Sequence, residues 1–194
     1  MSESAPATVE DAASRWLMII DMQRIFAETS SEWATPGYGS ASAGIQQLLG
    51  AFQPRICLTR FLPPEQPAGA WIDYYQKWPF ALDPRNEPLY ELTDEFVSIP
   101  ATIVDRTTFG KWDAETDRAL GNPDAIVLAG VTTDCCVIST ALAAADAGVH
   151  VTVAADACAG VTKEDHQRAL DVMALYRPLI DIAEVDSILA SLAK

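Results

Sequence analysis

Short apolar runs alternate with segments of helical periodicity along most of this chain. Six of the runs have the length and composition of buried β-strands. They cover residues 16–20, 55–61, 101–104, 125–129, 150–154 and 178–183. Helical spacing or capping residues between the runs predict helices at residues 42–52, 113–120, 137–147, 163–176 and 187–192. Strands that alternate with helices pair in parallel through right-handed crossovers. The pattern therefore predicts an α/β fold, a three-layer αβα sandwich with a six-stranded, mostly parallel sheet.

Two polar residues mark the starts of predicted helices, and one long segment interrupts the alternation. Asp113 and Thr162 stand where N-caps belong. Residues 62–100 carry seven of the twelve prolines, which excludes one regular element there. We expect only short helical turns near residues 71–78 and 89–92. A loop of this length in a compact domain usually borders a site or an interface.

The two ends of the chain differ in character. Residues 1–14 are rich in Ser, Ala and Glu and lack the basic start and apolar centre of a signal peptide. We therefore expect a flexible N-terminal tail over residues 1–14. Residues 15–194 are predicted to form a single domain, because the chain is 49% hydrophobic and long enough for one well-packed core.

Charge and cysteine content narrow the classes of partner. The formal net charge of -14 disfavours binding to nucleic acid or to an anionic membrane. No apolar run approaches the ~20 residues that span a bilayer. The four cysteines form neither a metal-ligand spacing nor a disulfide framework, which favours a reducing cytoplasm. We therefore expect a cytoplasmic protein.

Residues 124–147 combine a strand, a turn with two thiols and a helix. The apolar run leads through Gly130 to the adjacent Cys135 and Cys136, and an alanine-rich helix follows and stops at Gly148. A helix N-terminus offers unpaired backbone N–H groups and a partial positive charge, which stabilise a thiolate and lower its pKa. The same donors can hold an oxyanion. This layout is typical of a hydrolase with a cysteine nucleophile.

A cysteine nucleophile needs a base, and the two histidines are poorly placed for that role. His150 begins a strand and His166 stands in the first turn of a helix, so a surface or helix-capping role is favoured for each. Ligands in parallel sheets bind beyond the carboxyl ends of the strands. Asp21 follows the apolar run LMII at such an end and is a candidate general base.

A buried acid beside a thiol calls for a compensating cation. Lys111 follows the third strand, and its flexible ammonium can contact both Asp21 and the thiolate. The alternative is that Asp21 caps a loop and that Lys111 is a solvated surface charge.

Three stretches carry a family resemblance, in order along the chain. They read LMIIDMQRIF at the first strand, FGKW after the third and GVTTDCCVISTALAAADAG around the thiols. This set resembles the signature blocks of the isochorismatase-like cysteine hydrolases, which include nicotinamidases and N-carbamoylsarcosine amidohydrolases. The likeness runs from about Trp16 to Ile182. It implies Asp21 as the base, Lys111 as its cationic partner, a nucleophilic cysteine, and a homo-oligomer, either a dimer or a tetramer.

The family pattern also distinguishes the two thiols. It places the nucleophile directly before a Val and two residues after the Asp of a Thr-Asp pair, which selects Cys136. Cys135 is then a small packing residue, since a disulfide between neighbouring residues is strained. The resemblance further implies a cis peptide between Val131 and Thr132. It implies an oxyanion hole made of the backbone amides of Thr132 and Cys136.

Two departures from familiar relatives narrow the chemistry. Nicotinamidases generally carry an Asp and two His metal ligands after the second strand, and that region here has no histidine. True isochorismatases, which cleave a vinyl ether, lack the nucleophilic cysteine. We therefore expect hydrolysis of a small-molecule substrate, a non-peptide amide, ureide or N-carbamoyl compound, through a thioester. We expect this reaction to need no metal and no cofactor. The alternative is a catalytically silent binding or scaffold protein.

Aromatic residues near the proposed site suggest a substrate pocket. The predicted substrate-binding residues are Gln23, Phe26, Trp33, Trp71 and Tyr74. For the whole cluster at residues 71–78, which also holds Tyr75 and Trp78, a packed loop or a subunit interface is an equal alternative. Arg60, after the second strand, can pair with a substrate carboxylate, although a structural salt bridge is the commoner fate of such an arginine.

Overall fold

The central sheet has six parallel strands, as the sequence predicts. The structure is a computed structural model that describes residues 15–193, so the predicted tail at residues 1–14 lies outside the described residues. The strands are β1 (Trp16–Ile20), β2 (Ile56–Phe61), β3 (Thr102–Arg106), β4 (Ala125–Val131), β5 (His150–Ala159) and β6 (Ile180–Ala183). Their order across the sheet is β3-β2-β1-β4-β5-β6, and every pairing is parallel.

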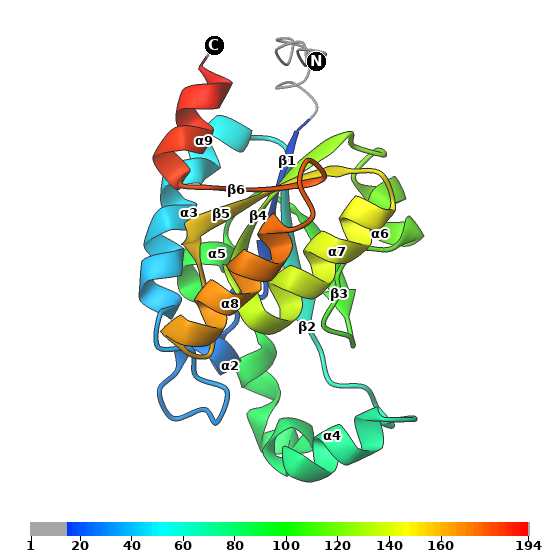
Figure 1. Ribbon diagram of the computed structural model, residues 1–194. Coiled ribbons are helices and arrows are strands. Elements are labelled where there is room, and N and C mark those ends of the chain that lie inside the picture. The colour runs from blue at the N-terminus through cyan, green and yellow to red at the C-terminus, as the bar shows by residue number, and fades with distance from the viewer. Residues whose placement is uncertain (1–14, 194) are drawn as a thin grey trace.

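Helices cover both faces of this sheet (Figure 1). They are α2 (Arg24–Ala27), α3 (Tyr38–Phe52), α4 (Trp71–Lys77), α5 (Asp94–Val97), α6 (Ala114–Ala119), α7 (Ile138–Asp146), α8 (Lys163–Ala174) and α9 (Val185–Leu192). Two 3-10 turns, η1 (Pro79–Leu82) and η2 (Pro84–Tyr90), and a π-turn, η3 (Thr133–Val137), complete the set. In Figure 1, α3 and α9 lie on one face, and α6, α7 and α8 on the other. The three-layer α/β sandwich is confirmed.

Two hydrophobic cores explain why the central strands are apolar without a break. Successive side chains of a strand point to opposite faces of a sheet. Leu17 and Ile19 therefore pack in the core beneath α3 and α9, whereas Met18 and Ile20 pack in the core beneath α7 and α8. All four side chains are fully buried. Each such burial stabilises the fold by roughly 1.5–3 kcal/mol.

β5 runs five residues beyond its predicted end. Its register with β4 shifts, because Leu128 pairs with Val153 while Gly130 pairs with Cys158. The extra residues on β5 form a bulge that includes the exposed Asp156. A charged residue inside the strand ended the apolar pattern in the sequence. In the structure its carboxylate accepts a 2.8 Å hydrogen bond from the backbone N–H of Val185, at the start of α9.

Side-chain caps fix two helix starts as predicted. The Asp113 carboxylate accepts hydrogen bonds from the backbone N–H groups of Glu115 and Thr116, at 2.9 and 2.8 Å. The Thr162 hydroxyl accepts a 3.0 Å hydrogen bond from the Asp165 N–H at the start of α8. Both contacts satisfy donors that a helix N-terminus otherwise leaves unpaired.

The proline-rich segment lies beyond one end of the sheet and contains only short helices. α4 matches the predicted turn at residues 71–78, whereas the second turn begins earlier than predicted, at Pro84. Figure 1 places α4 past the end of the sheet at which α7 begins. The segment therefore stands next to the carboxyl ends of the strands, where a parallel sheet binds its ligands.

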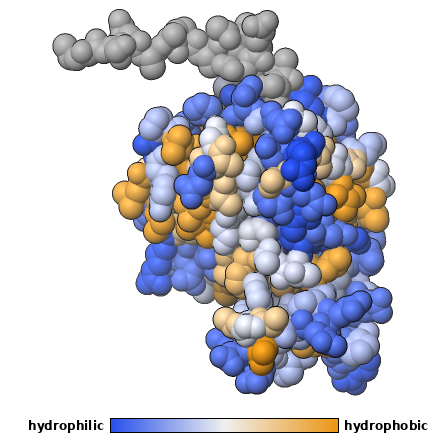
Figure 2. Space-filling view, turned by 90° about the vertical axis from the view of Figure 1, so that its right-hand side faces the viewer, coloured by the Kyte–Doolittle hydropathy of each residue, from blue (hydrophilic) through white to orange (hydrophobic). Residues whose placement is uncertain are grey.

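The face of the molecule in Figure 2 is largely polar. Figure 2 shows hydrophilic residues over most of one face and hydrophobic ones in separate clusters. No helix within residues 15–193 is long and apolar enough to cross a membrane.

Candidate active site

The structure brings Asp21, Lys111 and Cys136 together at the carboxyl end of the sheet. Asp21 directly follows β1, and its side chain is fully buried. The Lys111 ammonium, also fully buried, lies 3.0 Å from Asp21 Oδ2. Cys136 is 4% exposed and stands in η3, directly before α7. The alternative of a surface lysine and a loop-capping aspartate is therefore wrong.

Thr59 holds Asp21 from the neighbouring strand β2. Its hydroxyl donates a 2.6 Å hydrogen bond to Asp21 Oδ1 and accepts a 3.1 Å hydrogen bond from the Asp21 backbone N–H. Asp21 has a φ of 50°, in the left-handed region that few non-glycine residues adopt. The two Thr59 contacts stabilise that conformation. Oδ2 forms the ion pair with Lys111, and the Asp21 carboxylate also faces the Cys136 thiol.

Lys111 is tied to the thiol-bearing turn through Thr140 of α7. The Lys111 backbone N–H donates to the Thr140 hydroxyl at 3.0 Å, and that hydroxyl donates to the carbonyl oxygen of Cys136 at 2.6 Å. The Lys111 ammonium donates to the carbonyl oxygen of Thr108 at 2.7 Å and lies 5.0 Å from the centre of the Phe61 ring. These contacts fix both ends of the lysine side chain.

The pKa of the Cys136 thiol is raised well above its ordinary value of 9.0. Burial is the main cause, the negative charge of Asp21 adds to it, and the positive charge of Lys111 opposes it. This corrects the expectation that a helix N-terminus lowers the pKa of this thiol. The thiol sits in a π-turn ahead of α7, is almost fully buried and faces the Asp21 carboxylate. Burial and the Asp21 charge therefore favour the protonated form of the thiol.

Cys135 occupies a different environment from its neighbour. It is only partly buried, and its sulfur lies 3.8 Å from Asp134 Oδ2. Burial raises its pKa, and the negative charge of Asp134 raises it further. All four cysteines are free thiols, so the adjacent pair forms no disulfide.

The turn between β4 and the thiols is held by α8 and by the loop before it. Asp134 Oδ1 accepts a 2.9 Å hydrogen bond from the Val161 N–H, and the Thr133 hydroxyl lies 2.8 Å from Nδ1 of His166. The Val131–Thr132 peptide is cis. Within the described residues, the Thr132 N–H donates to no backbone carbonyl, so this donor remains available.

His166 differs from its expected surface or helix-capping role. It is partly buried against the turn, and burial lowers its pKa. His150 begins β5, at the end of the sheet away from the thiols, as the sequence indicates.

Gly130 allows β4 to approach β1 closely just before this turn. Its φ is +119°, and a Cβ atom there would lie 2.2 Å from the carbonyl oxygen of Ile20. Only glycine fits this position. The close approach brings the strand that carries the turn beside the strand that ends at Asp21.

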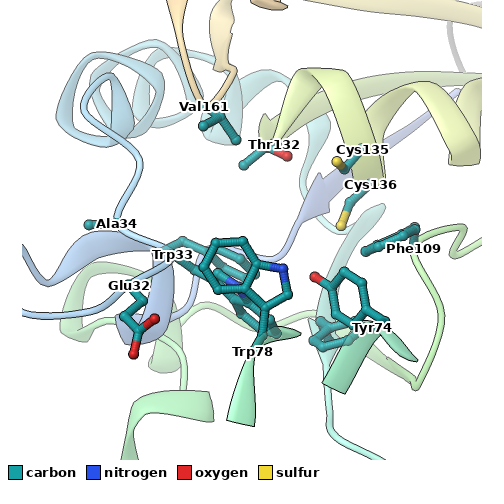
Figure 3. A pocket seen from close by; sticks show the side chains of 12 residues that line it. Glu32, Trp33, Ala34, Tyr74, Trp78, Phe109, Thr132, Cys135, Cys136 and Val161 are labelled. Carbon is teal, nitrogen blue, oxygen red and sulfur yellow. The ribbon is translucent and has the colours of Figure 1, made fainter. Parts of the chain in front are cut away.

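Beside these groups lies a cavity of about 230 Å³. Thr132, Cys135 and Cys136 form one side of it. Its other walls are mainly aromatic, and these residues are Phe26, Trp33, Phe61, Tyr74, Trp78 and Phe109. Figure 3 shows the Cys136 sulfur directed into the cavity, with the Tyr74 hydroxyl and the Phe109 ring near it. A small ligand held in this cavity would contact the thiol.

Comparison of the sequence with models of protein families shows the family of this chain. The family model for the isochorismatase domain matches residues 15–184. The chain belongs to the isochorismatase family. The resemblance of its three sequence blocks is thereby confirmed.

Solved structures of isochorismatase relatives share the fold. A cysteine hydrolase from Pseudomonas syringae pv. phaseolicola 1448A has a TM-score of 0.83 at 19% identity, over 100% of this chain and 99% of that chain. An isochorismatase-like hydrolase from Alkaliphilus metalliredigens has a TM-score of 0.75 at 18% identity, over 93% and 98%. A pyrazinamidase of Pyrococcus horikoshii in complex with zinc has a TM-score of 0.69 at 24% identity, over 88% and 99%. No curated protein matched the sequence.

The described residues of this isochorismatase domain offer no group of side chains that could bind a zinc ion. Within residues 15–193, no three His, Cys, Asp or Glu side chains are grouped so that they could hold an ion. The residues after β2 that would supply histidine ligands include none.

Three of the five predicted substrate-binding residues line the cavity of this isochorismatase domain. They are Phe26, Trp33 and Tyr74. Trp71 lies behind the wall, where its ring packs 4.9 Å from Phe109 and 5.2 Å from Tyr74, measured between ring centres. Trp71 is therefore not among the residues that line the cavity, contrary to its prediction as a substrate contact.

Gln23 is also wrongly predicted as a substrate contact. Its side chain is fully buried and does not line the cavity. Its amide nitrogen donates to the carbonyl oxygens of Phe61 and Tyr90, at 3.0 and 2.5 Å, and its amide oxygen accepts a 2.8 Å hydrogen bond from the Phe61 N–H. Gln23 therefore joins the end of β2 to the proline-rich segment.

Gln23→Leu is expected to lower the free energy of unfolding by about 2–4 kcal/mol, because it leaves buried backbone groups without partners. Urea unfolding measures this loss. Gln46→Leu, at an exposed position of α3, is the matched control and is expected to change stability by less than about 0.5 kcal/mol. Equal stability of the two variants would contradict the bridging role of Gln23.

Arg60 forms the structural salt bridge that the sequence favours. Its guanidinium contacts Asp105 at 2.7 Å and Glu91 at 3.4 Å, and the hydrogen bonds to Asp105 raise its pKa. Sequence reasoning missed Phe61 and Phe109 as cavity walls. Phe109 belongs to the FGKW block, and its place two residues before Lys111 was the one sequence feature that could have pointed to it as a cavity wall.

Proposed function

We propose that this protein is a cysteine-dependent hydrolase of a small non-peptide amide, ureide or N-carbamoyl compound, with Asp21, Lys111 and Cys136 as its catalytic groups. The observation that carries the proposal is the fully buried Asp21–Lys111 ion pair beside a thiol that opens into a cavity. Removing two charged groups from water costs about as much free energy as their mutual attraction returns, so a buried ion pair adds little to stability. The position of this pair beside the thiol therefore favours a role in the reaction over a role in the fold.

The first step forms a bond between sulfur and the substrate carbon. Asp21 takes the proton of the Cys136 thiol while the sulfur attacks the amide carbonyl carbon. The raised pKa of the thiol supports this coupled transfer over a preformed thiolate. The carbonyl oxygen becomes an oxyanion, and the backbone N–H groups of Thr132 and Cys136 donate to it.

The second half of the reaction returns the enzyme to its starting state. The protonated Asp21 donates its proton to the leaving nitrogen, the C–N bond breaks, and ammonia or an amine departs from the thioester. A water molecule then gives a proton to Asp21 and adds to the thioester carbon. The C–S bond breaks, the proton returns to Cys136, and the acid product leaves. Lys111 balances the charge of Asp21 whenever that carboxylate is ionised.

Release of ammonia from a panel of small primary amides, ureides and N-carbamoyl amino acids tests the proposal. We expect turnover of at least one class, together with an intact-mass increase of one acyl group on Cys136 after rapid quenching in acid. No turnover of any class, with no acyl adduct, would favour the silent scaffold protein instead.

Thr59→Val tests how Asp21 is positioned. Valine keeps the shape of threonine but removes the hydrogen bonds to the Asp21 carboxylate and N–H. We expect kcat to fall about 10- to 100-fold with KM nearly unchanged, because a hydrogen bond to a charged group is worth about 1.5–3 kcal/mol. Steady-state kinetics on the best amide of the panel measure both constants. Thr59→Ser keeps the hydroxyl and should restore most of kcat, and a serine variant as slow as the valine variant would refute the positioning role.

A further inference from the structure

The cavity beside Cys136 contains one charged side chain, and it is acidic. Among the twelve lining residues, all of them described, only Glu32 carries a charge. From this charge and the aromatic walls we infer that the substrate is an aromatic amide whose end remote from the amide carries a positive charge. This inference rests on the proposed function, because it assumes that the amide carbon meets the thiol.

Neither Lys111 nor Arg60 is free to hold an anionic substrate. Lys111 is fully buried, and its ammonium already contacts Asp21 and the Thr108 carbonyl. Arg60 is engaged by Asp105 and Glu91. A substrate carboxylate in the cavity would therefore meet no cationic lining residue and would lose its hydration.

The aromatic walls favour a cation over a neutral group. Trp33 stands at their centre, with its ring centre 6.2 Å from that of Phe26, 6.0 Å from that of Tyr74 and 6.4 Å from that of Trp78. The faces of such rings attract a cation through their quadrupoles. Lys77 already lies 5.3 Å from the centre of the Trp78 ring without lining the cavity. Trp33 is therefore the main platform for a substrate cation.

The position of Glu32 agrees with a substrate charged at one end. Figure 3 shows Glu32 on the far side of Trp33 and Trp78 from Cys136. An amide carbonyl at the thiol would direct the other end of the molecule across these rings toward the Glu32 carboxylate. Glu32 is exposed and forms no salt bridge with any described residue, so its charge is available. The net charge of -14 also attracts cations toward the cavity and repels anions.

Three matched amides test the inference: 4-(trimethylammoniomethyl)benzamide, its neutral isostere 4-(2,2-dimethylpropyl)benzamide, and 4-(carboxymethyl)benzamide. Their dissociation constants are measured by calorimetry on the Cys136→Ala variant, so that binding does not depend on turnover. We expect the cation to bind about tenfold more tightly than the neutral isostere, and the anion to bind most weakly. Glu32→Gln should reduce the tenfold preference to about threefold and leave the neutral amide unchanged.

Glu65→Gln is the control, because it removes the same charge from an exposed position that does not line the cavity. It should leave the preference for the cation intact. The inference is overturned if the neutral amide binds as tightly as the cation, if Glu32→Gln weakens all three amides equally, or if none of them binds. Turnover of the same amides by the unaltered protein is measured separately. If the amides bind in the expected order but neither they nor any compound of the panel is hydrolysed, the hydrolase function is refuted and the charge preference stands. If they are hydrolysed but do not bind in that order, the charge preference is refuted and the hydrolase function stands.

Discussion

Cys136→Ala is expected to lower amide hydrolysis by more than about 10³-fold, because it removes the thiol that faces Asp21 and would form the acyl intermediate. Cys135→Ala is the matched control, since it removes the adjacent thiol from the same turn and leaves the Asp21–Lys111 pair intact. We expect that variant to lose less than about tenfold. Ammonia release by equal amounts of folded protein measures both. A larger loss in the Cys135 variant would reverse the assignment of the nucleophile.

The pH dependence of alkylation checks the state of the same thiol. Iodoacetamide reacts with the thiolate form, and the raised pKa of Cys136 means that less thiolate is present at any given pH. The rate of Cys136 alkylation, followed by peptide mass spectrometry, should therefore keep rising as pH increases through 9. A plateau near neutral pH would show a thiolate already formed at rest and would contradict the coupled proton transfer to Asp21.

Sequence patterns located the groups that lie at strand ends. Asp21 follows an apolar run and Cys136 stands between a run and a helix, and in a parallel sheet such positions meet at one edge. This rule, with the order of the three sequence blocks, is enough to bring both residues to one site. It needs no knowledge of which strands are neighbours.

Contacts that depend on which strands are neighbours in the sheet could not be predicted from the sequence. Thr59 reaches Asp21 because β2 pairs with β1 in the register that places Leu58 beside Ile19. The only signal was one threonine within the run ICLTRF. Gln23 was misread for a related reason, because its partners at Phe61 and Tyr90 lie 38 and 67 residues away in the chain. A polar residue near a catalytic base is as easily a buried bridge as a substrate contact.

The sequence also could not show how deeply the Cys136 thiol is buried. The helix-terminus argument predicted a lowered thiol pKa because it weighed only the local dipole. In the folded protein Cys136 is enclosed beside Asp21, and burial together with the negative charge of Asp21 raises the pKa of its thiol. The local sequence shows that a helix begins near the thiol. How far the thiol is removed from water depends on every segment that covers the site, and these segments are distant in the chain.

Lys111→Met and Asp21→Asn are each expected to lower the free energy of unfolding by about 3–5 kcal/mol, because each leaves one buried charge without its partner. Methionine has nearly the length of lysine, and asparagine tolerates the left-handed backbone conformation in which Asp21 is held. Urea unfolding measures the two losses. Stability equal to that of the unaltered protein in either variant would show that water reaches the pair.

The double variant Asp21→Asn/Lys111→Met separates stability from chemistry. With both charges gone, no uncompensated ion is buried, so the double variant should be more stable than either single variant, with a coupling energy of at least about 2 kcal/mol. Hydrolysis should nevertheless be lost in all three variants, because each lacks the base or the cation that balances it. If the double variant recovered activity together with stability, the pair would serve the fold alone. Recovery of stability without activity would mean that the two charges are kept for the reaction at Cys136.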